Sequence, residues 1–123
     1  MDLKDQVVNL ELSKKLKELG VKQKSLWWWT DYKQNGDYRL NYNLGIASTH
    51  SLSISAFTVA ELGEMLPNRI LSSNNWEDNG KWRTQDFMEP AKNQEMQYAD
   101  TEANARAKML IYLIESGKIW NKD

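Results

Sequence analysis

The sequence predicts an α+β fold in which two β-hairpins form one small antiparallel sheet, packed against two longer terminal helices and one short central helix. Two observations support this. Apolar residues recur at helical spacing near both ends of the chain. Asn35-Gly36 and Asn79-Gly80 each lie between β-prone runs, a pattern typical of hairpins. The chain has 123 residues, so we expect residues 1–123 to form a single α+β domain.

The first helix is predicted from an apolar stripe, and its start is expected between residues 2 and 9. The stripe consists of Val8, Leu12, Leu16 and Leu19. Gly20 suits the left-handed position after the last turn, where Val21 would pack back on Leu16 as in a Schellman motif. The sequence therefore predicts that this helix ends just before Gly20.

The next predicted element is an aromatic hairpin around Asn35-Gly36. A two-residue turn pairs Trp29 with Tyr42. Because side chains alternate between the faces of a strand, Trp27 and Trp29 are then expected to face the core and Trp28 to face outward. A three-residue turn would shift the register by one residue and exchange these roles.

The central helix has a strong start signal. Thr58 and Glu61 match a capping box, Phe57 and Leu62 match the accompanying hydrophobic staple, and Pro67 is expected to end the helix. Before this helix, residues 45–55 are predicted to be a loop that closes with a short strand near Leu52 and Ile54.

The C-terminal half is predicted to contain a second hairpin and the last helix. The hairpin strands cover residues 70–77 and 81–88, and a loop is predicted over residues 90–97. Thr101 is the expected N-cap of the last helix and Gly117 its end. Its apolar face contains Ala103, Ala107, Met109, Leu110, Leu113 and Ile114.

Composition argues against several classes of protein. Sixteen basic and 17 acidic residues give a net charge of −1, which does not favour general binding to duplex nucleic acid. The absence of cysteine excludes disulfides, thiolate zinc sites and thiol catalysis. No segment approaches the roughly 20 apolar residues that cross a bilayer, and the N-terminus does not resemble a signal peptide. We therefore expect a cytoplasmic protein without a membrane partner.

The sequence offers no convincing catalytic, metal or cofactor site. His50 is the single histidine and lies in a Ser/Thr-rich segment, where we expect a solvated loop residue. Glu61 and Glu64 share one side of the central helix, but Glu61 already has a capping role. We predict a protein that is not an enzyme and binds neither a metal nor a cofactor.

The aromatic hairpin supplies the candidate binding surface, on the strand face that Trp28 occupies. The surface consists of Trp28, Tyr32, Arg39, Asn41 and Asn43. Aromatic, guanidinium and amide groups are frequent at protein interfaces, and aromatic rings beside a positive charge can also stack single-stranded bases. Three interpretations are open: another element of the fold covers this face, it binds a protein, or it binds nucleic acid or a small ligand.

Three segments together resemble a family of small phage and prophage proteins of bacteria that has no established function. They are LELSKKLKELGVKQKSLWWW, SAFTVAELGEMLP and TEANARAKMLIYLIESGKI, in the same order. The resemblance implies a phage or prophage gene, a protein in the host cytoplasm and a small accessory role. We therefore predict a non-enzymatic protein that binds a host or phage protein through its aromatic sheet face. The alternatives are a self-associating structural protein, such as a homodimer, and a single-stranded nucleic-acid binder.

Overall fold

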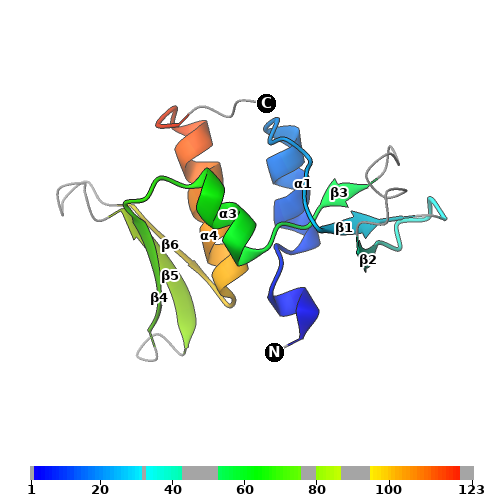
Figure 1. Cartoon of the computed structure of the whole chain (residues 1–123), viewed down its shortest axis with the longest axis horizontal. Coiled ribbons are helices and arrows are strands. Elements are labelled where there is room, and N and C mark those ends of the chain that lie inside the picture. The colour runs from blue at the N-terminus through cyan, green and yellow to red at the C-terminus, as the bar shows by residue number, and fades with distance from the viewer. Residues whose placement is uncertain (1, 32, 43–52, 76–79, 87–94, 120–123) are drawn as a thin grey trace.

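The computed structural model describes residues 2–31, 33–42, 53–75, 80–86 and 95–119 (Figure 1). Two small antiparallel sheets lie at opposite ends of the molecule, with the helices between them. In chain order the elements are η1 (Leu3–Asp5), α1 (Leu10–Glu18), β1 (Trp27–Thr30), β2 (Arg39–Tyr42), β3 (Ile54–Ser55), α3 (Val59–Met65), β4 (Ile70–Asn75), β5 (Lys81–Asp86), β6 (Met96–Ala99) and α4 (Glu102–Glu115). The predicted α+β class is confirmed.

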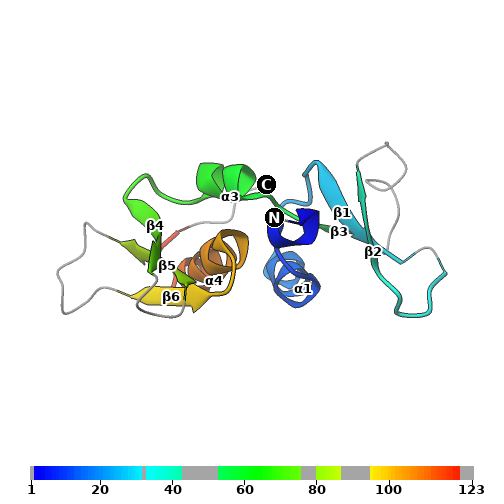
Figure 2. The same cartoon turned by 90° about the horizontal axis from the view of Figure 1, so that it is seen from below.

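The prediction that both hairpins form one sheet is wrong. The strand orders are β2-β1-β3 and β4-β5-β6, so each hairpin gains a third strand of its own. Figure 2 shows α4 against the second sheet and α1 beside the first. Because a helix lies along each sheet, each sheet buries apolar surface without joining the other.

The two third strands come from segments with weak sequence signals. β3 pairs with β1 on the side opposite β2, which confirms the short strand predicted at Ile54; Leu52 lies outside the described residues. β6 pairs with β5, so the loop predicted over residues 90–97 is wrong at its C-terminal end. β6 has only four residues, Met96–Ala99, which is too short for a clear alternation of apolar and polar residues.

The register of the first hairpin differs from the predicted one by two residues. Trp29 lies opposite Leu40 and Trp27 opposite Tyr42, whereas a two-residue turn would pair Trp29 with Tyr42. A shift of two residues leaves every side chain on its predicted face of the strand. Trp27 and Trp29 therefore share a face with Leu40 and Tyr42, as the sequence predicts.

The shift arises because the turn is wider than a two-residue turn. The Asp31 carboxylate accepts hydrogen bonds from the backbone N–H groups of Asn35, at 3.3 Å, and Gly36, at 2.7 Å. Gln34 and Gly36 adopt positive φ values of 56° and 87°, and Asn35 does not. The carboxylate thus organises a wider turn than the Asn-Gly pair alone specifies.

Helix α1 ends as the sequence predicts, and it begins at Leu10, directly after the interval of residues 2–9 predicted for its start. The Asn9 side chain caps it by accepting a hydrogen bond from the N–H of Leu12 at 2.9 Å. Gly20 has a φ of 90°, and the N–H of Val21 donates to the carbonyl of Leu16 at 3.0 Å. This is the predicted Schellman motif.

Helix α3 has the predicted capping box. The Thr58 hydroxyl accepts from the N–H of Glu61, and the Glu61 carboxylate accepts from the N–H of Thr58 at 2.8 Å. The second Glu61 oxygen accepts from the N–H of Leu26 at 3.1 Å, which ties α3 to the start of β1. Both carboxylate oxygens of Glu61 therefore accept backbone hydrogen bonds that hold the fold together.

Helix α4 packs closely on the second sheet. Thr101 caps it, as predicted, and its small side chains Ala103, Ala105 and Ala107 are fully buried. The Thr84 hydroxyl of β5 donates to the carbonyl of Ala105 at 3.0 Å. Because alanine side chains are short, the Thr84 hydroxyl can reach the backbone of α4 at Ala105.

The main core lies where α1, α3 and α4 meet. Its largest fully buried side chains include Leu16, Phe57, Leu62, Met109 and Leu113. In the part of the chain that the structure describes, no helix has the length and apolar character to cross a membrane.

Candidate binding pocket between the two sheets

Trp28 is buried, so the prediction that its ring faces outward is wrong. Its relative exposure is 2%, and its indole N–H donates to the carbonyl of Ser25 at 3.1 Å. Its cross-strand neighbours are Asn41 on β2 and Ser55 on β3, and Ser55 is fully buried. The face of β1 that carries Trp28 and Thr30 is therefore the more buried one, although the cross-strand neighbours of Trp28 are polar.

The other residues of the predicted surface do not assemble around an exposed ring. Arg39 is exposed and forms an ion pair with Asp37 at 3.2 Å. Asn41 donates from its side chain to the carbonyl of Arg39 at 3.1 Å. Tyr32 and Asn43 lie outside the described residues. The structure thus brings Arg39 and Asn41 together on β2, and it removes the Trp28 ring from the surface.

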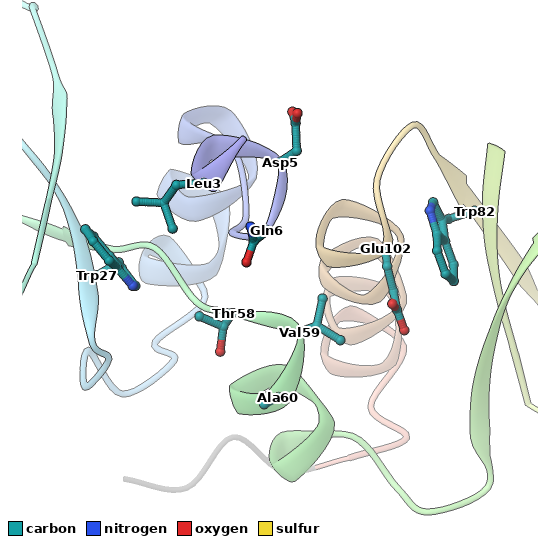
Figure 3. A pocket seen from close by; sticks show the side chains of 9 residues that line it. All are labelled: Leu3, Asp5, Gln6, Trp27, Thr58, Val59, Ala60, Trp82 and Glu102. Atoms are coloured by element: carbon teal, nitrogen blue, oxygen red, sulfur yellow. The ribbon is translucent and has the colours of Figure 1, made fainter. Parts of the chain in front are cut away.

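A pocket of about 330 Å³ lies between the two sheets, and we call it the inter-sheet pocket (Figure 3). It is lined by η1 and the residue after it, β1, the start of α3, β5 and the first turn of α4. The lining residues are Leu3, Asp5, Gln6, Trp27, Thr58, Val59, Ala60, Trp82 and Glu102. Figure 3 shows Trp27 and Trp82 at opposite ends, with Leu3, Thr58 and Val59 between them. A ligand that touches both indoles would therefore be elongated.

At one end of the pocket Trp27 is held by an aromatic contact. Its ring meets that of Tyr42 edge to face, with centroids 5.3 Å apart and planes at 78°. Tyr42 is 50% exposed and Trp27 is half-buried. Edge-to-face pairs of this kind contribute about 0.5–1.5 kcal/mol beyond burial. The pair presents a fixed aromatic edge next to solvent.

At the other end Trp82 lies beside Glu102. One Glu102 oxygen, Oε2, accepts from the Ser72 hydroxyl at 2.5 Å and from Nη2 of Arg106 at 3.2 Å. Glu102 is in the first turn of α4, where the helix dipole favours a carboxylate. Its position is therefore fixed from the sheet and from the next turn of its own helix.

The middle of the pocket is formed by the start of α3. The Thr58 hydroxyl is used in the helix cap, while Val59 and Ala60 supply apolar surface. Leu3 of η1 is 36% exposed. The lining thus combines aromatic and aliphatic groups with the carboxylates of Asp5 and Glu102 and the amide of Gln6, a composition suited to binding an amphipathic ligand.

The two described residues that were considered for catalysis, Glu61 and Glu64, do not line the pocket. His50 lies outside the described residues. Glu61 caps α3, and Glu64 is not part of the pocket lining. Among the residues that the structure describes, no cluster of three His, Cys, Asp or Glu side chains could hold a metal ion.

Sequence reasoning did not find this pocket. Trp82 lies in the predicted strand over residues 81–88, where it has no assigned role, and Trp27 is predicted to face the core. Their shared pocket depends on how the two sheets are placed around the helices. The one local signal was the high content of tryptophan, six in 123 residues.

Comparison with known proteins gives no relative from which a function could be transferred: no family model, curated protein or solved structure matches the chain.

Proposed function

We propose that this protein is a non-enzymatic binding module that holds an extended segment of a protein partner in the inter-sheet pocket. The observation that carries the proposal is the pair of tryptophans, Trp27 and Trp82, at opposite ends of one pocket. Tryptophan is enriched among the residues that dominate binding energy at protein interfaces. The elongated arrangement suits a segment of chain better than a compact metabolite.

Position and size of the pocket support this proposal. It lies where two sheets and two helix N-termini converge, so rigid elements fix most of its lining. A volume of about 330 Å³ is near the lower end of ligand pockets, which span roughly 300–1,000 Å³. The resemblance to small phage and prophage proteins suggests a host or phage protein in the host cytoplasm as the partner.

The test is a quantitative pull-down from nuclease-treated host lysate with three full-length proteins: wild type, Ala60→Gln and Arg39→Ala. Ala60 is exposed at the pocket and lies in the first turn of α3, so glutamine adds bulk there with little cost to the helix. Arg39 lies on β2 outside the pocket and is the matched control.

We expect a stoichiometric partner that Arg39→Ala retains and Ala60→Gln loses. Loss with Arg39→Ala alone would move the interface to β2. Retention by both variants would refute the proposed role of the pocket.

Self-association is a second candidate, favoured by the outer face of the second sheet. Leu71 and Tyr98 are 53% and 41% exposed. They are the cross-strand partners of Gln85 and Arg83 on β5, and all four side chains lie on the same face of the sheet. Exposed apolar groups gathered on one sheet face are typical of interfaces. Sedimentation equilibrium of wild type and Leu71→Ser tests it: a dimer that the substitution dissociates would support it, and a monomer at all concentrations would exclude it.

Single-stranded nucleic-acid binding receives no support from the hairpin. The stacking surface predicted there requires an exposed Trp28 ring, and that ring is buried.

A further inference from the structure

We infer that the inter-sheet pocket selects a segment that carries a basic side chain, lysine or arginine, at the end formed by Trp82 and Glu102. This inference rests on the proposed function, because it specifies the segment that the pocket holds. It is carried by the charge of the lining, by the hydrogen bonding of Glu102 and by the neighbouring indole.

Among the described residues that line the pocket, two carry carboxylates and none carries a basic side chain. The carboxylates belong to Asp5 and Glu102, at different parts of the pocket, and Figure 3 shows Asp5 pointing away from the centre. Arg106 balances part of the charge of Glu102, but it does not line the pocket. Asp5 forms no ion pair with another described residue. Glu102 is therefore the carboxylate of the described lining that lies closest to a ligand held between the two indoles, and Arg106 balances its charge from outside the pocket.

The hydrogen bonds of Glu102 leave one oxygen for a ligand. Oε2 accepts from Ser72 and from Nε and Nη2 of Arg106, at 2.5, 3.3 and 3.2 Å. Oε1 accepts no hydrogen bond from the described residues. A carboxylate held in place by one oxygen can accept a charge-assisted hydrogen bond at the other without losing side-chain freedom on binding.

The indole of Trp82 provides the second contact for a cation. Figure 3 shows Trp82 and Glu102 at the same end of the pocket. Tryptophan is the strongest aromatic partner for a lysine or arginine cation. A basic side chain with an apolar stem would place its charge near this carboxylate and ring, while the rest of the segment runs past Val59 toward Trp27.

The experiment is selection from a phage-displayed library of random dodecapeptides with the full-length protein as bait, followed by titration of synthetic peptides. Each selected peptide is also made with its basic residue replaced by citrulline or norleucine, which changes the ligand without changing the protein. Binding is measured to wild type, Ala60→Gln and Glu102→Gln. Glutamine keeps an oxygen that can accept from Ser72 and Arg106, and thermal unfolding verifies that each variant is folded.

We expect selected peptides to share a basic residue, to lose binding on Ala60→Gln and to bind about tenfold more weakly when that residue is neutral. On Glu102→Gln, the affinities of the basic peptide and of its neutral version should become nearly equal. Peptides that need the pocket but bind equally with a neutral residue would overturn the inference and leave the proposed function intact. If no selected peptide binds more weakly to Ala60→Gln than to wild type, both the inference and the proposed function are overturned.

Discussion

Replacing Trp28 with alanine should be the most destabilising of the three single substitutions in the tryptophan run. The Trp28 ring is 2% exposed, whereas Trp27 and Trp29 are half-buried. A buried tryptophan removes roughly 150–250 Å² from water, which at about 25 cal/mol per Å² corresponds to about 4–6 kcal/mol. The hydrogen bond from its indole to Ser25 adds about 1 kcal/mol, and alanine retains part of the burial. We therefore expect a loss of about 3–5 kcal/mol in the free energy of unfolding, as is typical of large-to-small core substitutions.

The assay is urea unfolding followed by far-UV circular dichroism, because fluorescence would change with the deleted indole. Domains of this size are stable by only about 5–15 kcal/mol, so Trp28→Ala can leave the chain partly unfolded. Trp28→Phe and Trp27→Phe then provide the comparison, since both keep an aromatic ring. Trp28→Phe should still cost more, because it also leaves the Ser25 carbonyl without its indole donor. If either Trp27 variant is as destabilising as its Trp28 counterpart, the assignment of the buried face of β1 is refuted.

Three further substitutions test the helix ends and one helix contact, each by thermal and urea unfolding. Thr58→Ala removes the cap of α3 and should cost about 1 kcal/mol; an unchanged unfolding midpoint would contradict the importance of the capping box. Gly63→Ala would ordinarily stabilise a helix by about 1 kcal/mol, but its new Cβ would lie 2.9 Å from Nη1 of Arg106. We expect that gain to be lost, and a full gain would show that the arginine moves away freely. Gly20→Ala places a side chain at a φ of 90° and should destabilise by about 1 kcal/mol or more, whereas any stabilisation would be inconsistent with the Schellman end of α1.

Sequence alone determined the three α-helices that the structure describes, the start of two of them and their C-terminal ends. Caps and Schellman motifs involve residues a few positions apart, so Thr-x-x-Glu and terminal glycine signals act locally. The start of α3 at Thr58 and the ends of α1 at Gly20 and of α4 at Gly117 follow from such signals. The alternation of side chains along β1 is equally local, which is why the predicted faces survived a register shift of two residues.

Tertiary structure decided which of those faces is buried, how many sheets form and where a ligand could bind. Trp28 is buried in a sheet whose third strand contributes Ser55, its cross-strand partner from a segment far along the chain. The inter-sheet pocket depends on placing Trp27 and Trp82, which belong to different sheets, around the same helix ends. Such contacts join segments distant in sequence, and no local pattern records them, because their free energy is realised only when the helices have packed and set the two sheets in place.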